Sequence, residues 1–228
     1  MTFDSDTPHS EFCVPRSEFR AIVIGGSAGG FEALTAILSE LPGDFLLPVL
    51  VVQHLHPCDD GSFARHLARA TRLPVIEPCD KEPIERGRLY AAPANYHMLV
   101  ERDGSTIALS IDERVNWSRP SIDVLFESGA GAWGEGVIAI LLSGANADGA
   151  KGMGEVKKAG GMTIAQDPAS AQNPVMPQAA IDAGVVDEVL GLEQIGQRLV
   201  ELGTRKSESR KRKSERGRLT RGVLRSEF

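Results

Sequence analysis

Cysteine is scarce in this chain, and its few copies fit neither a disulfide framework nor a metal site. Cys13, Cys58 and Cys79 are odd in number and far apart, and no two of them form a Cys-x-x-Cys pair. Small disulfide-bonded domains carry even numbers of cysteines, and zinc sites carry closely paired ones. The sequence therefore predicts reduced thiols.

Long hydrophobic runs and targeting signals are also missing. No apolar stretch approaches the roughly 20 residues needed to cross a bilayer, and residues 1–17 lack the basic start and apolar centre of a signal peptide. With 42% hydrophobic residues among 228, the chain can bury a core as one domain. We therefore expect a cytoplasmic protein without a transmembrane segment.

Basic charge is concentrated at one end of the chain. The net charge is -6, yet residues 204–228 hold 10 Lys and Arg against 3 Asp and Glu, without apolar periodicity. Such charge runs are usually solvated, so we expect a disordered tail and no nucleic-acid partner. The sequence thus divides into a disordered leader over residues 1–18, a folded domain over 19–203 and a basic tail over 204–228.

The stretch around Ser27 predicts a strand, a tight turn and a helix. Residues 21–24 are apolar and β-prone, glycines flank Ser27 on both sides, and residues 31–38 repeat apolar groups at helical spacing. Glycine lacks the Cβ that blocks a sharp reversal. A serine hydroxyl at such a corner stands clear of the sheet edge, beside the amides that open the helix.

Strands and helices alternate through the rest of the domain. Further strands are predicted over residues 48–54, 75–76, 88–93, 136–142, 162–165 and 185–189, and helices over 61–73, 121–128, 150–159, 176–183 and 192–202. Extended residues 97–101 and 106–109 flank an Asp-Gly turn, which is a hairpin signal. We therefore predict an α/β fold: a doubly wound, mostly parallel sheet in a Rossmann-like three-layer arrangement, with a β-hairpin insertion.

His54 and Asp148 follow two of the predicted strands, as Ser27 follows the first. The carboxyl ends of parallel strands meet at one edge, where ligands bind in such sheets. Taken singly, a structural role is favoured for His54 and a turn or helix-cap role for Asp148. Together the three side chains are the nucleophile, base and orienting acid of a Ser-His-Asp relay.

Two other chemistries fit these stretches poorly. A dinucleotide-binding loop needs Gly-x-Gly-x-x-Gly, and Ser27 takes the place of its middle glycine, while Gln53 stands near the end of the second strand where the fingerprint has an acidic residue. Residues 54–60 resemble the HxHxDH box of binuclear metallohydrolases, but Cys58 and Asp59 replace its Asp and final His. We expect neither a metal nor an organic cofactor.

From Arg20 to about Leu202 the chain resembles the catalytic domain of the chemotaxis protein-glutamate methylesterases, the CheB family. Many motifs match in the same order along the chain, which makes coincidence improbable. The matching segments are residues 24–30 (IGGSAGG), 52–57 (VQHLHP), 89–93 (LYAAP) with 97–98 (HM), 119–126 (RPSIDVLF), 142–150 (LSGANADGA), 163–167 (TIAQD) and 176–177 (MP).

The resemblance implies a Ser27, His54, Asp148 triad and an oxyanion site made by the backbone amides of Ala28 and Ala145. The family commonly has Thr and Met at those last two positions, a difference that leaves the amides in place. It further implies hydrolysis of glutamate methyl esters on chemoreceptor cytoplasmic helices with release of methanol, and deamidation of receptor glutamines as a second activity.

Many members of this family also carry an N-terminal receiver domain. The 18 or so residues before the first strand are too few for one, so we expect no attached receiver. Two alternatives stay open: a non-catalytic partner-binding module on the same scaffold, and an esterase for a different substrate.

Overall fold

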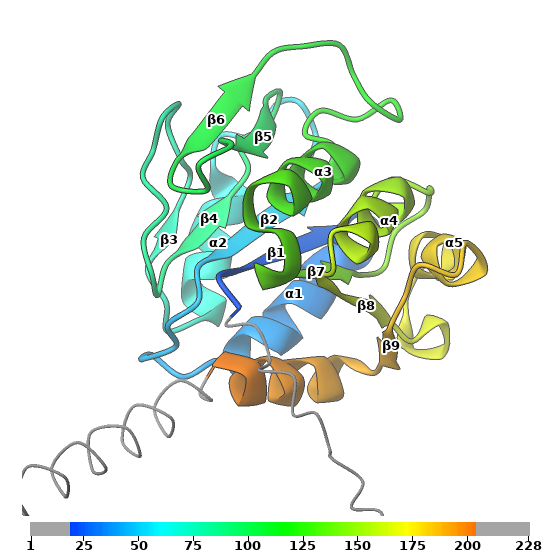
Figure 1. Cartoon of the computed structure of the whole chain (residues 1–228). Helices are drawn as coiled ribbons and strands as arrows, with labels where there is room; N and C mark the ends of the chain where they lie inside the picture. Colours follow the sequence, from blue (N-terminus) through cyan, green and yellow to red (C-terminus); the bar gives the residue numbers. More distant parts are fainter. Residues whose placement is uncertain (1–18, 204–228) are drawn as a thin grey trace, which may run out of the picture.

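The computed structural model describes residues 19–203, which form a three-layer α/β domain with one sheet between two layers of helices (Figure 1). No helix in this range has the length and apolarity needed to span a bilayer. The predicted leader over residues 1–18 and the basic tail over 204–228 lie outside the described residues.

The central sheet is parallel and has the strand order β3-β4-β2-β1-β7-β8-β9. Its strands are β1 (Ala21–Gly26), β2 (Val49–Gln53), β3 (Val75–Ile76), β4 (Leu89–Ala91), β7 (Val137–Leu141), β8 (Met162–Gln166) and β9 (Glu188–Leu190). An antiparallel hairpin of β5 (His97–Val100) and β6 (Ile107–Ser110) is inserted after β4. The predicted doubly wound sheet with a hairpin insertion is confirmed.

Helices cover both faces of the sheet. One face packs on α1 (Gly30–Ser39), α2 (Ser62–Ala70) and the helical residues 192–203, and the other packs on α3 (Ile122–Trp133), α4 (Ala150–Lys158) and α5 (Val175–Asp182). Short 3-10 turns, η1 (Gly134–Gly136) and η2 (Pro168–Ser170), follow α3 and β8. Figure 1 shows α3 and α4 in front of the sheet and α1 behind it.

The alternation of side chains along β1 explains its continuous apolar sequence. Ile22 and Ile24 belong to the core on the α1 side, whereas Ala21 and Val23 belong to the core on the α3 side, and all four are 0% exposed. A parallel strand buried on both faces needs apolar residues at every position. The strand therefore reads as an unbroken apolar run.

Two of the glycines around the first turn have different physical roles. A Cβ on Gly25 would lie 2.2 Å from Ile122 Cγ2, so glycine there lets the first turn of α3 approach β1. Gly29 has a φ of 78°, a conformation that side chains with a Cβ rarely adopt. The tight turn predicted after β1 depends on this second glycine.

The last strand differs from the prediction. Residues 185–189 were expected to be extended, but β9 begins at Glu188. Thr163 Oγ1 donates to the Val185 carbonyl at 2.8 Å, and the Asp187 carboxylate accepts the Thr163 amide at 3.0 Å. The Asp187 amide still donates to the Thr163 carbonyl at 3.0 Å, and side-chain hydrogen bonds supply the other contacts before β9.

Candidate active site

Ser27 and His54 follow neighbouring strands at the same register. Gly26 of β1 pairs with Gln53 of β2, and the His54 amide extends this ladder by donating to the Gly26 carbonyl at 3.1 Å. Neighbouring strands lie about 4.8 Å apart, and side chains alternate between the two faces. Val52 faces the α3 side of the sheet, so the same alternation directs His54 and Ser27 to that side.

His54 and Asp148 form a hydrogen-bonded pair, as the sequence predicts. His54 Nε2 lies 2.8 Å from Asp148 Oδ2, and their side chains are 13% and 0% exposed. A carboxylate accepts but does not donate, so it selects the tautomer with the proton on Nε2. This arrangement leaves His54 Nδ1 as the basic nitrogen.

Asp148 is held by donors from α3 and from the loop before it. Its carboxylate accepts hydrogen bonds from four further groups: the amides of Ile122 (2.7 Å) and Asp123 (3.3 Å), Ser121 Oγ (2.9 Å) and Asn116 Nδ2 (2.8 Å). Because two of these donors open α3, Asp148 also acts as an N-terminal cap, supplied from another part of the chain. The catalytic and the helix-cap interpretations of Asp148 describe the same carboxylate.

These contacts set the protonation state of Asp148. Burial by itself would raise the pKa of this carboxyl, but hydrogen bonds from His54, Asn116 and the Ile122 amide outweigh burial and hold the pKa below its ordinary value. Asp148 is therefore a carboxylate at neutral pH. A fixed negative charge at this position holds the His54 ring in one orientation through its Nε2 proton.

In the described part of the chain, the Ser27 hydroxyl has no hydrogen bond to His54. The hydroxyl beside His54 Nδ1 is that of Ser118, whose Oγ lies 3.5 Å away, at the outer limit of a hydrogen bond. Ser118 belongs to the loop between β6 and α3, and no motif in the sequence singles it out. Ser27 as nucleophile stays a prediction, with Ser118 as its competitor.

The peptide after Ser27 turns its amide away from the interior. The Ser27 carbonyl accepts hydrogen bonds from Gln53 Nε2 at 2.6 Å and from the Gly30 amide at 2.8 Å. Carbonyl and N–H point in opposite directions across a planar trans peptide. The Ala28 amide, in the same peptide as the Ser27 carbonyl, therefore points away from Gln53 and Gly30.

The Ala145 amide is placed by the same means. The Gly144 carbonyl accepts the Met176 amide of α5 at 2.9 Å, so the N–H of the Gly144–Ala145 peptide points the opposite way. Ala28 and Ala145 are both exposed, and in the described part of the chain neither amide donates a hydrogen bond to the protein. Two free amides on the loops after β1 and β7 suit the predicted oxyanion role.

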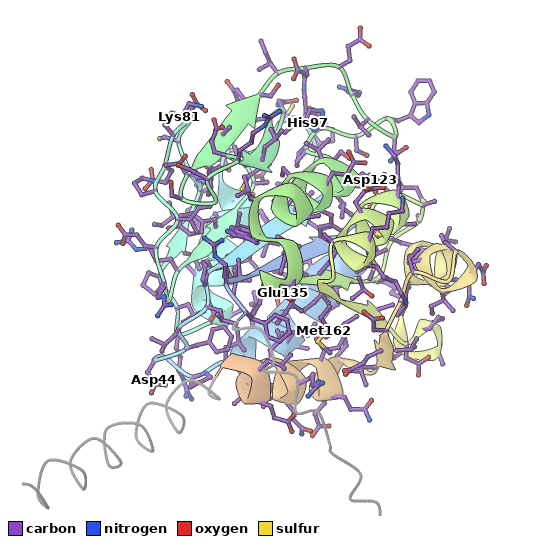
Figure 2. The ribbon with its side chains drawn as sticks, viewed as in Figure 1. Asp44, Lys81, His97, Asp123, Glu135 and Met162 are labelled. Carbon is purple, nitrogen blue, oxygen red and sulfur yellow. The ribbon has the colours of Figure 1, made fainter. Side chains whose placement is uncertain are left out.

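Asp123 is a functional candidate that sequence reasoning missed. Its Oδ1 accepts the amides of Gly149 (2.9 Å) and Gly152 (2.7 Å) at the start of α4, and Figure 2 shows the side chain where α3 and α4 meet. Asp123 thus caps α4 from α3, while Asp148 caps α3 from the turn before α4. Asn116 Nδ2 bridges the two carboxylates at 2.8 Å from each.

Asp123 could have been noticed in the sequence as an acidic residue in the first turn of α3. Acidic residues at such positions ordinarily stabilise the helix to which they belong, so its contact with α4 could not be predicted. Gln53 was noted because it departs from a dinucleotide-binding pattern, and nothing local assigns its amide to the Ser27 carbonyl. Asn116 and Ser118 carry no sequence signal of this kind, because their partners are long-range.

Asp123 is expected to give folding stability a pH dependence opposite in sign to that of Asp148. Burial first, and then the nearby Asp148 charge, raise the pKa of Asp123 above 3.8. Its contribution is complete below pH 3.8 and is lost as pH rises through the raised folded pKa. Urea unfolding of the wild type and Asp123→Asn between about pH 4 and pH 7 should show the wild type losing stability relative to the variant as pH rises. A difference that stays flat or grows with pH contradicts this assignment.

The metal-like segment after β2 has a structural role. His56 Nδ1 accepts the Cys58 amide at 3.2 Å, and Asp59 accepts the Gly61 amide at 3.1 Å just before α2. Within residues 19–203, no group of three or more His, Cys, Asp or Glu side chains is arranged to hold a metal ion.

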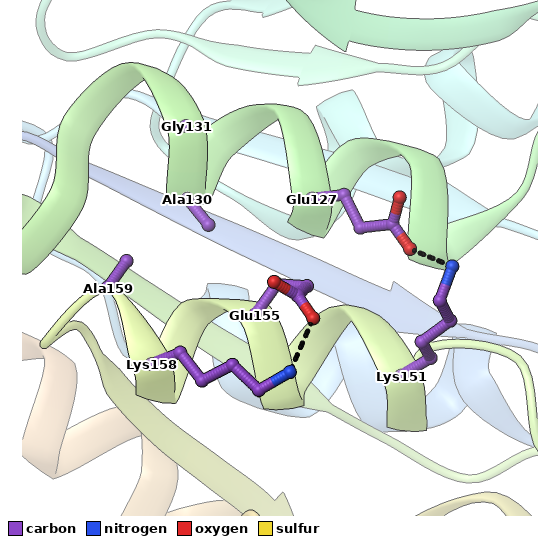
Figure 3. A pocket seen from close by; sticks show the side chains of 7 residues that line it. All are labelled: Glu127, Ala130, Gly131, Lys151, Glu155, Lys158 and Ala159. Carbon is purple, nitrogen blue, oxygen red and sulfur yellow. Dashed lines mark hydrogen bonds and ion pairs between the residues drawn. The ribbon is translucent and has the colours of Figure 1, made fainter.

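A groove of about 400 Å³ lies elsewhere, between α3 and α4 (Figure 3). Its charged side chains are paired with each other: Lys151 with Glu127 at 2.9 Å, and Lys158 with Glu155 at 2.8 Å. None of the predicted site residues lines it. The groove is therefore separate from the candidate active site.

Comparisons with known proteins place the domain in a family. The family model of the CheB methylesterases matches residues 22–199. A Leptospira interrogans protein, provisionally assigned as a protein-glutamate methylesterase/protein-glutamine glutaminase, is 44% identical over 192 residues, which cover 84% of this chain and 99% of that protein. A Bradyrhizobium diazoefficiens protein-glutamate methylesterase/protein-glutamine glutaminase is 41% identical over 180 residues, which cover 78% of this chain and 45% of that protein.

The chain thus spans nearly the whole of one relative and about half the length of another. Among solved structures, the CheB methylesterase catalytic domain of Thermotoga maritima superposes with a TM-score of 0.78 at 34% identity, covering 82% of this chain and all of that one. The match includes the strands that carry Ser27, His54 and Asp148. The chain belongs to the CheB methylesterase family.

Proposed function

We propose that this protein hydrolyses the γ-methyl esters of glutamate residues on the cytoplasmic helices of methylated chemoreceptors, releasing methanol, and that it also deamidates receptor glutamines. It acts in the cytoplasm and uses Ser27, His54 and Asp148 with the amides of Ala28 and Ala145.

One arrangement carries the proposal. His54, paired with Asp148, follows β2 at the register where Ser27 follows the neighbouring strand β1, and two free backbone amides lie on the loops after β1 and β7. Acyl transfer needs a hydroxyl, a base oriented by a carboxylate and donors for an oxyanion.

The first half-reaction forms an acyl-enzyme. Ser27 Oγ attacks the ester carbonyl carbon while His54 Nδ1 takes its proton, and Asp148 stabilises the imidazolium. The Ala28 and Ala145 amides donate to the negative oxygen of the tetrahedral intermediate, each such donor typically contributing about 3 kcal/mol. His54 then protonates the departing methoxide, and methanol leaves.

The second half-reaction restores the enzyme. His54 Nδ1 deprotonates a water molecule that attacks the glutamyl ester of Ser27, and the proton returns to Ser27 Oγ as glutamate is released. A glutamine side chain follows the same steps with ammonia as the leaving group.

Ser118 is the competing nucleophile because its Oγ lies 3.5 Å from His54 Nδ1. The amides of both serines are already donated, that of Ser118 to the Val115 carbonyl at 2.9 Å and that of Ser27 to the Ser143 carbonyl at 2.9 Å. The second of these bonds joins the loops after β1 and β7, which carry the free Ala28 and Ala145 amides. Catalytic hydrogen bonds often tighten once substrate is bound. The oxyanion geometry therefore favours Ser27.

Methanol release from a methyl-esterified chemoreceptor cytoplasmic fragment tests the function. We expect catalytic release of methanol, with free glutamate at the esterified positions by mass spectrometry. No methanol release, combined with fluorophosphonate labelling of the enzyme, would instead indicate an esterase for another substrate. No release and no labelling would indicate a non-catalytic module.

A further inference from the structure

An exposed tryptophan stands beside the candidate active site. Trp117 is 94% exposed, whereas Trp133 is 6% exposed and donates to the Gly104 carbonyl at 3.1 Å. The residues on either side of Trp117 both reach the site: Asn116 through Asp148, and Ser118 through His54. The indole is therefore anchored within a few residues of the groups that would hold a substrate.

The backbone at Trp117 has a conformation that a tryptophan does not favour. Val115 and Ser118 exchange two backbone hydrogen bonds, at 3.2 and 2.9 Å, and close a two-residue turn. The two turn residues, Asn116 and Trp117, have φ values of 50° and 64°. Turns with positive φ at both positions prefer asparagine at the first and glycine at the second. Trp117 thus occupies a glycine-like position and gains no burial from it.

The loop that carries Trp117 is braced rather than loose. Arg119 Nη1 donates to the carbonyls of Ile111 at 2.6 Å and Asp112 at 2.9 Å, and His97 Nε2 contacts the Glu113 carbonyl at 3.0 Å. A rigidly presented aromatic side chain loses little conformational entropy on binding, which favours its use as a contact residue.

We propose that Trp117 is a specificity residue whose indole packs on an aliphatic side chain of the substrate, one helical turn from the esterified glutamate. This inference rests on the proposed function. Side chains three or four residues apart on a helix lie 5–6 Å from each other, a separation that an indole next to the site can span. Trp117 would then favour helical polypeptides over small esters.

Paired substrates test this inference. One is a helical peptide with a glutamate γ-methyl ester and leucine four residues away, and the other is the γ-methyl ester of N-acetylglutamate amide. We expect Trp117→Gly to raise KM for the peptide about 10-fold relative to the small ester, with kcat within about twofold. Trp117→Phe should retain most of the wild-type preference for the helical peptide over the small ester.

Leu46→Ala is a matched control, since Leu46 is 43% exposed and precedes β2 at the opposite edge of the sheet. It should leave the selectivity unchanged. Trp117→Gly should also keep its melting temperature or raise it, because glycine suits the positive φ. An unchanged selectivity, or an equal loss on both substrates, overturns the inference.

A binding measurement separates this inference from the proposed function. In Ser27→Ala protein, the helical peptide should reduce acrylamide quenching of the exposed Trp117, while Trp133 is already buried. If no variant hydrolyses either ester, the proposed function has failed, and protection of Trp117 still supports the contact. Quenching that the peptide leaves unchanged overturns it.

Discussion

Replacing Ser27 by alanine is expected to lower kcat for glutamate methyl esters by roughly 10⁴-fold or more. The variant keeps the oxyanion amides and the His54–Asp148 pair but has no hydroxyl to form the acyl-enzyme. Its fold should be unchanged, since in the described residues no protein group bonds to the Ser27 hydroxyl. Methanol release under saturating substrate measures the effect.

Ser118→Ala is the matched control for this variant. Ser118 Oγ has two long contacts, 3.5 Å to His54 Nδ1 and 3.4 Å to the Asn116 carbonyl, so its removal should lower kcat less than about 10-fold. The opposite ranking of the two variants would transfer the nucleophile assignment to Ser118.

Replacing Asp148 by asparagine is expected to lower kcat about 10⁴-fold and to destabilise the fold. Every hydrogen-bond partner of the Asp148 carboxylate is a donor. Its Oδ2 accepts from His54 and the Ile122 amide. Its Oδ1 accepts from Asn116, Ser121 and the Asp123 amide. Whichever way the asparagine side chain is turned, its NH₂ group faces other donors and finds no acceptor. Buried polar groups are then left unpaired, and each costs about 1–3 kcal/mol of folding free energy. Activity assays and urea unfolding at pH 7 measure the two effects.

The exposed carboxyl of Asp112 gives the control for this variant. Asp112→Asn should change the free energy of unfolding by less than about 0.5 kcal/mol. A stable Asp148→Asn protein with near wild-type kcat would contradict both the triad and the shared capping of α3.

The pH dependence of Asp148 follows from its lowered pKa. Its contribution to folding stability is complete above pH 3.8, the ordinary value, and is lost as pH falls through the lower folded pKa. The contribution of Asp123 to folding stability is instead complete below pH 3.8 and is lost as pH rises. Asp148 therefore stabilises the fold on the high-pH side of 3.8, and Asp123 stabilises it on the low-pH side.

Local patterning was sufficient for most of the fold. The apolar runs of β1, β2 and β7 and the glycines before α1 predicted a parallel sheet with its functional residues at the carboxyl ends of strands, and the protein has that topology. The β9 boundary was wrong because the side chains of Thr163 and Asp187 supply all but one of the hydrogen bonds between the two segments before β9. Such hydrogen bonds between side chains far apart in the chain leave no pattern in the local sequence.

The His54–Asp148 contact was predictable because strand ends converge at one edge of a parallel sheet. The network around it was not, because it depends on a reciprocal capping of α3 and α4 through Asp123 and Asn116. That arrangement arises from the packing of two helices whose starts are 28 residues apart in the chain. Periodicity and propensity carry no information about such contacts.

Mapping of a fluorophosphonate adduct tests the central claim most directly. Peptide mass spectrometry of labelled wild-type protein should place the phosphonyl group on Ser27, and His54→Ala should abolish labelling because the hydroxyl loses its base. Labelling of Ser118, or labelling of Ser27 that persists in His54→Ala, would contradict the relay of Ser27, His54 and Asp148.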